Sequence, residues 1–134
     1  MMENKRTLEE VRKIFEDDRF ATENGAVIER IGERSATCSL VLTPSHRNAM
    51  GAVMGGVSFM LADFAFAVAA NLDKMDCVSL RSDISFLSAA KGEKLIAEAV
   101  CIKNGQSTAC YRGDVMDELG NLTATVTVTG YHVG

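Results

Sequence analysis

The sequence predicts an α+β domain in which an antiparallel sheet wraps around one central, buried helix. The segment 57–70 carries apolar residues on every face, which is typical of a helix that is buried all round. Six short runs rich in apolar and β-branched residues surround it, two before and four after. The two outermost strands of such a sheet expose a free edge, which favours side-by-side pairing with a second copy of the chain.

The individual elements follow from local signals. Thr7 and Glu10 stand at the spacing of a capping box, which begins the first helix. Gly32 and Glu33 are expected to form a tight hairpin turn, and Asn104-Gly105 is a strong signal for a two-residue hairpin. The expected elements are a short helix over 7–18, strands over 26–31 and 35–43, a central helix over about 55–73, and strands over 78–87, 94–103, 107–116 and 122–133.

Length and composition narrow the class of protein. The 134 residues fit a single domain, 1–134, with no linker or repeat. The net charge of −4, without a basic run, argues against a nucleic-acid partner, because phosphate neutralisation needs clustered cations. The first 15 residues lack the apolar core of a signal peptide, and no apolar run reaches the ~20 residues that a bilayer needs. We therefore expect a soluble cytoplasmic protein without a membrane partner.

The residues that bind metals are scarce. The four cysteines form no C-x-x-C pair, and the chain has only two histidines. Free, mostly buried thiols are expected, with no metal site and no cofactor.

One carboxylate stands out in the central apolar segment. Asp63 lies near the middle of the helix expected to be buried. Burying an ionised carboxylate is costly unless a hydrogen-bond network or a function requires it. Asp63 is therefore a candidate general base or nucleophile, and the alternative is an Asp that caps a neighbouring loop or subunit.

The start of the same helix offers hydrogen-bond donors. Gly55 and Gly56 leave free backbone N–H groups at the positive end of the helix dipole, and glycine lets a ligand approach them closely. The Asn48 side chain is a further amide donor, unless it forms a local turn. His46 is a candidate for orienting Asn48 or for acid catalysis, although a loop histidine without chemistry is the simpler interpretation.

The segment 46–63 resembles the signature of the PaaI-type branch of the hotdog thioesterases. That signature is roughly N-x-x-G-x-x-H-G-G followed by a helix with an Asp. Asn48, Gly51, Gly55, Gly56 and Asp63 stand at the matching spacings. The resemblance continues through V-S-L-R-S-D-I-S-F-L-S-A-A-K, and the order of elements agrees over nearly the whole chain.

The resemblance implies a hotdog fold, acyl-CoA thioesterase activity and a site shared between two subunits of a homodimer or homotetramer. Asp63 would activate water or attack the thioester, while the Gly55 N–H polarises the carbonyl with help from Asn48. Ser79 resembles a position that helps to place the water or substrate. The chain has Met54 where the family often has His, and methionine neither donates a hydrogen bond nor carries charge.

Met54, Gly56, Ser79 and His46 are accordingly the residues expected to line the substrate. The acyl tail is expected beside the central helix, near Met60 and Phe64. Two other functions stay open at this point. A hotdog dehydratase or hydratase would use His46 with Asp63, and a non-catalytic acyl-CoA-binding module would account for Met54.

Overall fold

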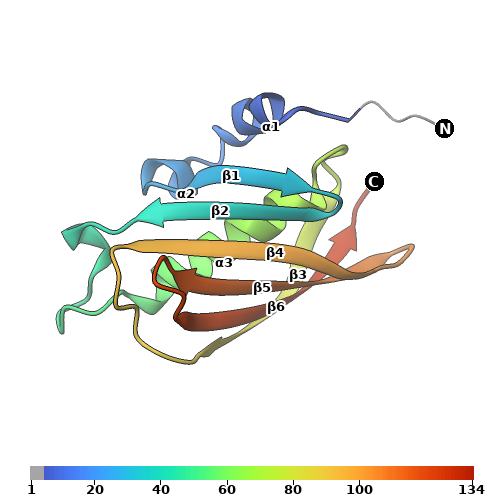
Figure 1. Cartoon of the computed structure of the whole chain (residues 1–134). Helices are drawn as coiled ribbons and strands as arrows, with labels where there is room; N and C mark the ends of the chain where they lie inside the picture. Colours follow the sequence, from blue (N-terminus) through green and yellow to red (C-terminus); the bar gives the residue numbers. More distant parts are fainter. Residues whose placement is uncertain (1–4) are drawn as a thin grey trace.

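The computed structural model describes residues 5–134. The elements along this part of the chain are α1 (Leu8–Phe15), α2 (Arg19–Glu23), β1 (Val27–Gly32), β2 (Ser35–Val41), the 3₁₀ helix η1 (Pro44–His46), α3 (Gly55–Ala70), β3 (Cys77–Phe86), β4 (Lys94–Asn104), β5 (Thr108–Asp117) and β6 (Leu122–His132). The strands form one antiparallel sheet in the order β1-β2-β4-β5-β6-β3. Figure 1 shows α3 running behind this sheet, which confirms the predicted α+β architecture.

The close packing of α3 on the sheet follows from the side chains that each contributes to their contact. Leu61 is fully buried, and burying a side chain of this size contributes about 1.5–3 kcal/mol. The sheet meets the helix with small residues such as Ala97 and Ala99 of β4. A Cβ atom at Gly113 of β5 would already contact Ala62 Cβ at 3.7 Å. Small residues on the inner face therefore let the helix lie close to the sheet.

The first helix begins as predicted and ends earlier. The Thr7 hydroxyl accepts from the Glu10 N–H at 3.1 Å, and the Glu10 carboxylate accepts from the Thr7 N–H at 2.8 Å, which confirms the capping box. The helix ends at Phe15 rather than at 18, because the chain turns there and the Asp18 N–H bonds to the Phe15 carbonyl at 3.0 Å. The short helix α2, which follows, was not predicted.

The central helix also ends before its predicted limit of about 73. Asn71 is buried at its C-terminal end, and its side-chain NH₂ donates to the carbonyls of Ala67 (2.9 Å) and Cys77 (3.0 Å). The Asn71 side-chain oxygen (Oδ1) accepts from the Cys77 N–H at 2.9 Å. One side chain thus terminates α3 at Ala70 and fixes the start of β3 beside it.

Two hairpins differ from the sequence expectation. Gly32 pairs with Ser35, so the β1–β2 turn consists of Glu33 and Arg34 rather than Gly32-Glu33, and Arg34 has a positive φ of 46°. Asn104 is the last residue of β4 rather than part of a two-residue loop. The connection closes through the Gly105 N–H, which donates to the Thr108 carbonyl at 2.8 Å.

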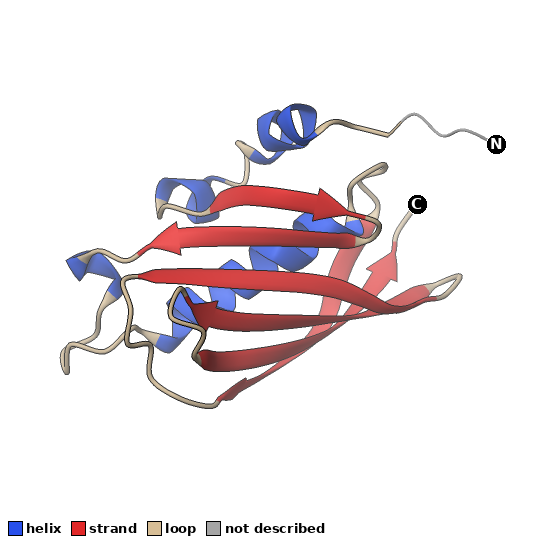
Figure 2. Cartoon of the chain, in the orientation of Figure 1, coloured by secondary structure: helices blue, strands red, loops and turns tan. Residues whose placement is uncertain are grey.

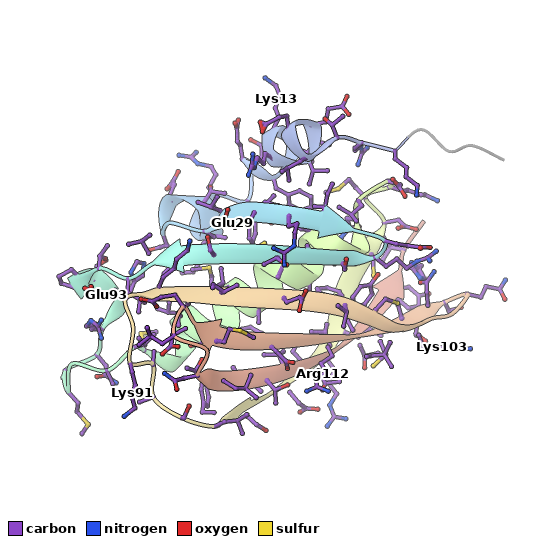
Figure 3. All side chains as sticks on the ribbon, viewed as in Figure 1. Lys13, Glu29, Lys91, Glu93, Lys103 and Arg112 are labelled. Carbon is purple, nitrogen blue, oxygen red and sulfur yellow. The ribbon has the colours of Figure 1, made fainter. Side chains whose placement is uncertain are left out.

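The two faces of the sheet differ in polarity. Figure 2 shows α3 on one side of the sheet, with α1 and α2 along its β1 edge. The opposite face carries charged side chains, among them Glu29 of β1 and Arg112 of β5 (Figure 3). Within the described range, no helix combines the length and hydropathy needed to cross a bilayer. All four cysteines are free, and Cys38 and Cys77 are buried.

Candidate active site

Asp63 lies on the least buried side of α3. This stripe consists of Gly56, Met60, Asp63, Ala67 and Ala70, which recur at helical intervals and are half-buried or exposed. The opposite side of the helix packs on the sheet. The Asp63 carboxylate has no hydrogen bond or ion pair with any residue that the structure describes. It is thus the one ionisable side chain of an apolar helix, and it faces outward without a partner.

Two effects raise the pKa of Asp63 above its ordinary value. The larger is partial burial, which disfavours the charged form, and the second is the negative charge of Asp18. Asp18 comes close because Phe15, three residues before it, packs edge-on against Phe64, with ring centroids 6.0 Å apart. Burial and the neighbouring Asp17 raise the pKa of Asp18 as well. A carboxylate with a raised pKa is a better proton acceptor, which suits general-base catalysis.

The N-terminus of α3 presents two unused donors. Met54 caps the helix through its backbone, since its carbonyl accepts from the Val57 N–H at 2.9 Å, and no side chain caps the helix start. The N–H groups of Gly55 and Gly56 find no acceptor among residues 5–134. The Met54 side chain is half exposed, and its methyl group would meet a Cβ at Gly56 at 2.7 Å. The two glycines therefore leave a narrow, donor-rich opening beside an apolar thioether.

Asn48 shapes the loop before this helix. Its side-chain oxygen accepts from the backbone N–H groups of Met50 (3.0 Å) and Ala52 (3.1 Å). The backbone N–H of Asn48 donates to the Ala52 carbonyl at 2.8 Å. This is the local turn that an Asn commonly forms. The turn uses the amide oxygen and leaves the amide NH₂ without a partner in the described residues, so the donor that the sequence suggested is still present.

His46 is a structural residue in this fold. It is 5% exposed, its Nδ1 accepts from the Thr43 N–H at 2.9 Å, and its Nε2 therefore donates to the Asn24 carbonyl at 2.8 Å. Both ring nitrogens are engaged, and they tie the 43–54 loop to the segment before β1. We expected His46 to orient Asn48 or to contact substrate, but neither ring nitrogen is free to do so.

The β3 strand contributes two hydroxyl groups rather than one. Ser79 is opposite Gly130 on the face toward α3, and it is exposed. A bulge at Leu80 shifts the register, so Ser82 also points to this face, opposite the buried Val128, and is half-buried. The sequence interpretation selected Ser79 and missed Ser82, because a bulge is not visible in an alternating pattern.

A small pocket of about 400 Å³ lies at the start of α3. Gly55 lines it together with the apolar side chains of Val53, Phe86 and Leu87 and with the following residues Ser88 and Ala89. The Phe86 ring packs directly over Gly55. The region near Phe64, where the acyl tail was expected, is different, since Phe64 is 3% exposed and packs in the core against Phe15. Phe86 is therefore a site residue that the sequence interpretation did not include.

One chain does not bring the candidate groups together. Gly55 and Asp63 are eight residues apart on α3, which places them about 12 Å apart along the helix axis. A single carbonyl group cannot accept from the Gly55 N–H and also lie within reach of Asp63 of the same chain. Among residues 5–134, no group of three His, Cys, Asp or Glu side chains is arranged to hold a metal ion. Within one chain, the Asp63 carboxylate and the Gly55 N–H therefore cannot act on the same carbonyl group.

A six-stranded antiparallel sheet packed on one long helix is the hotdog fold. The chain belongs to the Thioesterase superfamily, whose family model matches residues 50–124. This match runs from the loop before α3 into β6 and includes both Gly55 and Asp63.

Known relatives agree with this assignment. A protein of Archaeoglobus fulgidus described as "Putative esterase" is 33% identical over 121 residues, which cover 90% of this chain and 79% of the relative. A mutant of the phenylacetic acid degradation protein PaaI from Thermus thermophilus is 27% identical, with a TM-score of 0.79 over 85% of this chain and 98% of that one. A hypothetical thioesterase from Streptococcus pneumoniae, crystallised with coenzyme A, shares the fold at 24% identity, with a TM-score of 0.82 over 90% of this chain and 97% of that one. The protein is thus a thioester hydrolase of the PaaI type.

Proposed function

We propose that the protein hydrolyses acyl-CoA thioesters to a carboxylic acid and CoA at a site formed by two copies of the chain. Asp63 of one copy removes a proton from water, and the water oxygen attacks the thioester carbonyl carbon. The Gly55 N–H of the other copy, helped by the Asn48 amide, donates hydrogen bonds to the oxyanion. The C–S bond then breaks and the thiolate takes up a proton. A thiolate is a stable leaving group, so this chemistry needs no strong general acid.

The observation that carries this proposal is the separation of Asp63 from Gly55 along one helix, α3. Donors must lie 2.7–3.1 Å from an oxyanion, which a span of about 12 Å does not allow within one chain. A second copy related by a two-fold axis supplies the missing half. Antiparallel pairing of β3 with β3 of that copy would bring the Phe86 end of one strand, with Gly55 beside it, near the Cys77 end of the other.

The two edges of the sheet support β3 as the pairing strand. The β1 edge is partly covered by α1, and the Arg12 guanidinium donates to the Ile28 carbonyl at 2.9 Å. The β3 edge has no such cover among the described residues and exposes apolar side chains, including Leu80 (62%) and Phe86 (60%). An open apolar edge strand favours pairing with a second copy. We therefore propose a homodimer through β3, which further association could extend to a homotetramer.

The proposal that the substrate's thiol portion is CoA is supported by a relative of this protein. The Streptococcus pneumoniae relative was crystallised with coenzyme A, which supports CoA as the thiol portion of the substrate. The two alternatives receive less support. A dehydratase or hydratase would need a free histidine near Asp63, and His46 uses both ring nitrogens within the fold. A non-catalytic module would not require the raised pKa and unpartnered carboxylate of Asp63.

The test is free-thiol release from a panel of acyl-CoAs by the parent protein and by Asp63→Asn. Because Asn cannot accept the proton from water, we expect turnover to fall by at least about 10²-fold in a variant that remains folded. Asp114→Asn on the outer face of the sheet is the matched control and should retain turnover. Turnover that is indifferent to Asp63, or absent on every substrate, would overturn the proposal.

A single-turnover reaction in ¹⁸O-labelled water separates the two roles of Asp63. General-base catalysis places the label in the product acid during the first turnover. Attack by the carboxylate itself would form a mixed anhydride, and water attack at the Asp63 carbonyl would then place the label in the protein. We expect labelled acid and an unlabelled protein.

A further inference from the structure

The small pocket beside Gly55 has the chemistry of a site for a hydrocarbon chain. Its apolar lining residues are Val53, Phe86, Leu87 and Ala89. No ionisable side chain of the described residues lines it, and its one hydroxyl, that of Ser88, already donates to the Leu122 carbonyl at 2.8 Å. The phosphates of CoA need cationic partners and its amide groups need hydrogen-bond partners, which these walls do not offer. The pocket therefore suits the acyl side of a thioester rather than its thiol side.

The pocket also begins at the donor assigned to the oxyanion. Gly55 lines it, and the Gly55 N–H has no acceptor among residues 5–134. In a thioester, the acyl chain is attached to the same carbon as the carbonyl oxygen. A thioester whose oxygen is bound at Gly55 therefore has the first carbon of its acyl chain at the mouth of this pocket. Figure 1 shows the start of α3 and the end of β3, which form the pocket, at the same end of the molecule.

The rest of α3 offers little room for a long hydrocarbon chain. The side of the helix toward the sheet is closely packed, with Leu61 at 0% and Phe64 at 3% exposure. The larger pocket at the other end of α3, about 940 Å³ in volume, is lined by charged side chains that include Arg34 and Asp76. The pocket beside Gly55 has a volume of about 400 Å³, near the lower end of the roughly 300–1,000 Å³ typical of small-molecule sites. Its size favours a compact acyl group.

Two walls of this pocket are held in place by the backbone. The Leu87 N–H donates to the Thr123 carbonyl at 2.8 Å, and the Ser88 N–H donates to the same carbonyl at 3.3 Å, so this segment is tied to β6. On the other side, Val53 forms an antiparallel bridge with Arg47. These walls resist moving apart to accept a longer chain.

The Phe86 ring is the wall that can change. Its backbone is fixed in the sheet opposite the buried Ala124, while its side chain is 60% exposed and projects over Gly55. Exposed side chains change rotamer readily, so the ring can turn without disturbing the sheet. A bulky ring at this point shortens the pocket in front of the Gly55 N–H, and a smaller side chain would lengthen it.

We propose that Phe86 determines the length of the acyl chain that the enzyme accepts, and that its substrates are thioesters of short acyl groups. This inference rests on the proposed acyl-CoA thioesterase function and names its substrate class. A chain that is longer than the space in front of the ring leaves its last methylenes in water. Each methylene that remains in water forgoes a gain of about fourfold in kcat/KM, which corresponds to the free energy of burying it.

The experiment measures kcat/KM for straight-chain acyl-CoAs from acetyl-CoA to dodecanoyl-CoA with the parent, Phe86→Ala and Phe86→Trp. We expect the parent to prefer a short chain such as butanoyl. Phe86→Ala makes room for several methylenes and should raise the ratio of kcat/KM for octanoyl-CoA to that for butanoyl-CoA by at least about 10-fold. Phe86→Trp fills more of the pocket and should lower the same ratio. Ile102→Ala removes an apolar side chain of matching exposure (59%) near the β4–β5 hairpin, and as the control it should leave the ratio unchanged.

A ratio that is equal in the parent and both Phe86 variants would overturn the inference, as would a parent that prefers the longest chains. If Phe86 only supported the β3 edge, its replacement would lower kcat/KM by the same factor on every chain length, and that result also overturns the inference. Failure here is distinct from failure of the proposed function, because Asp63→Asn should abolish turnover of every acyl-CoA whatever residue limits the chain length.

Discussion

The ring of Phe86 lies over Gly55, so that a Cβ atom at Gly55 would come within 2.9 Å of Phe86 Cζ and 3.1 Å of Phe86 Cε1. The contact joins the start of α3 to the end of β3, two elements separated by a long stretch of sequence. It also limits the space around the Gly55 N–H, the donor assigned to the oxyanion. Glycine at this position thus serves both the close approach of a ring and the close approach of a substrate.

Gly55→Ala should fold and lose activity. The Phe86 ring is 60% exposed and can move, and alanine favours a helix, so we expect the melting temperature to stay within a few degrees of the parent. The methyl group and the displaced ring would obstruct the donor, and kcat should fall about 10²–10³-fold, as when an oxyanion donor is lost. In a Phe86→Ala background the same substitution should cost less. An identical loss in both backgrounds would show that the ring plays no part.

The acid limb of the pH–rate profile should depend on Asp18. A general base acts when deprotonated, so kcat/KM should rise with pH through the pKa of Asp63, which lies above the ordinary value of about 3.9. Asp18→Asn removes a neighbouring charge that raises this pKa and should move the limb to lower pH. Asp17→Asn, which acts on Asp18 rather than on Asp63, should move it less. An unshifted limb in Asp18→Asn would show that the two carboxyl groups are not coupled.

The two inward-facing hydroxyls of β3 can be told apart by paired substitutions. Ser82 is half-buried near the middle of the strand, and Ser79 is exposed near its start. Because a hydroxyl that places water must be shielded from bulk solvent, we expect Ser82→Ala to lower kcat about tenfold. Ser79→Ala should chiefly alter KM. The reverse pattern would restore Ser79 as the positioning residue.

Substitutions at Met54 test how the absence of the histidine that the family often has at this position affects activity. A histidine at this position could donate a hydrogen bond beside the Gly55 N–H, which a thioether cannot. We expect Met54→His to raise kcat/KM several-fold, whereas Met54→Leu should resemble the parent. The ratio of the two variants on one acyl-CoA measures the effect, and equal rates would mean that other groups already supply the missing hydrogen bond.

Asp117 should make stability depend on pH. Its carboxylate accepts from the Asn121 side chain and from the N–H groups of Lys91, Gly92, Leu119 and Asn121, and these bonds hold its pKa well below the usual range. A lowered folded-state pKa gives stability that is present above about pH 4 and is lost as the pH falls through the folded value.

Asp117→Asn should therefore lower the melting temperature at pH 7 by several degrees, and this difference should shrink as the pH falls from about 4 towards the folded-state pKa. Melting curves between pH 7 and pH 2 check this. A difference between parent and variant that did not shrink on acidification would contradict the assignment of the charge to these bonds.

The elements themselves could be read from local patterns. The Thr7–Glu10 capping box, the apolar run of the central helix and the alternation in each strand are near-neighbour effects, and the structure places them within a few residues of the prediction. The family signature around Asp63 is also local. The predicted end of the central helix was wrong, because a contact with the next strand decides it. Asn71 ends α3 by bonding to Cys77 of β3.

The sequence by itself determined the fold class and the placement of one aspartate and two glycines in the central helix, because periodicity and short motifs depend on residues close in the chain. The tertiary structure alone decided which side chains are available. It engaged both ring nitrogens of His46, turned Ser82 inward through a bulge, and placed Phe86 over Gly55. These depend on long-range hydrogen bonds and packing, which no local pattern records.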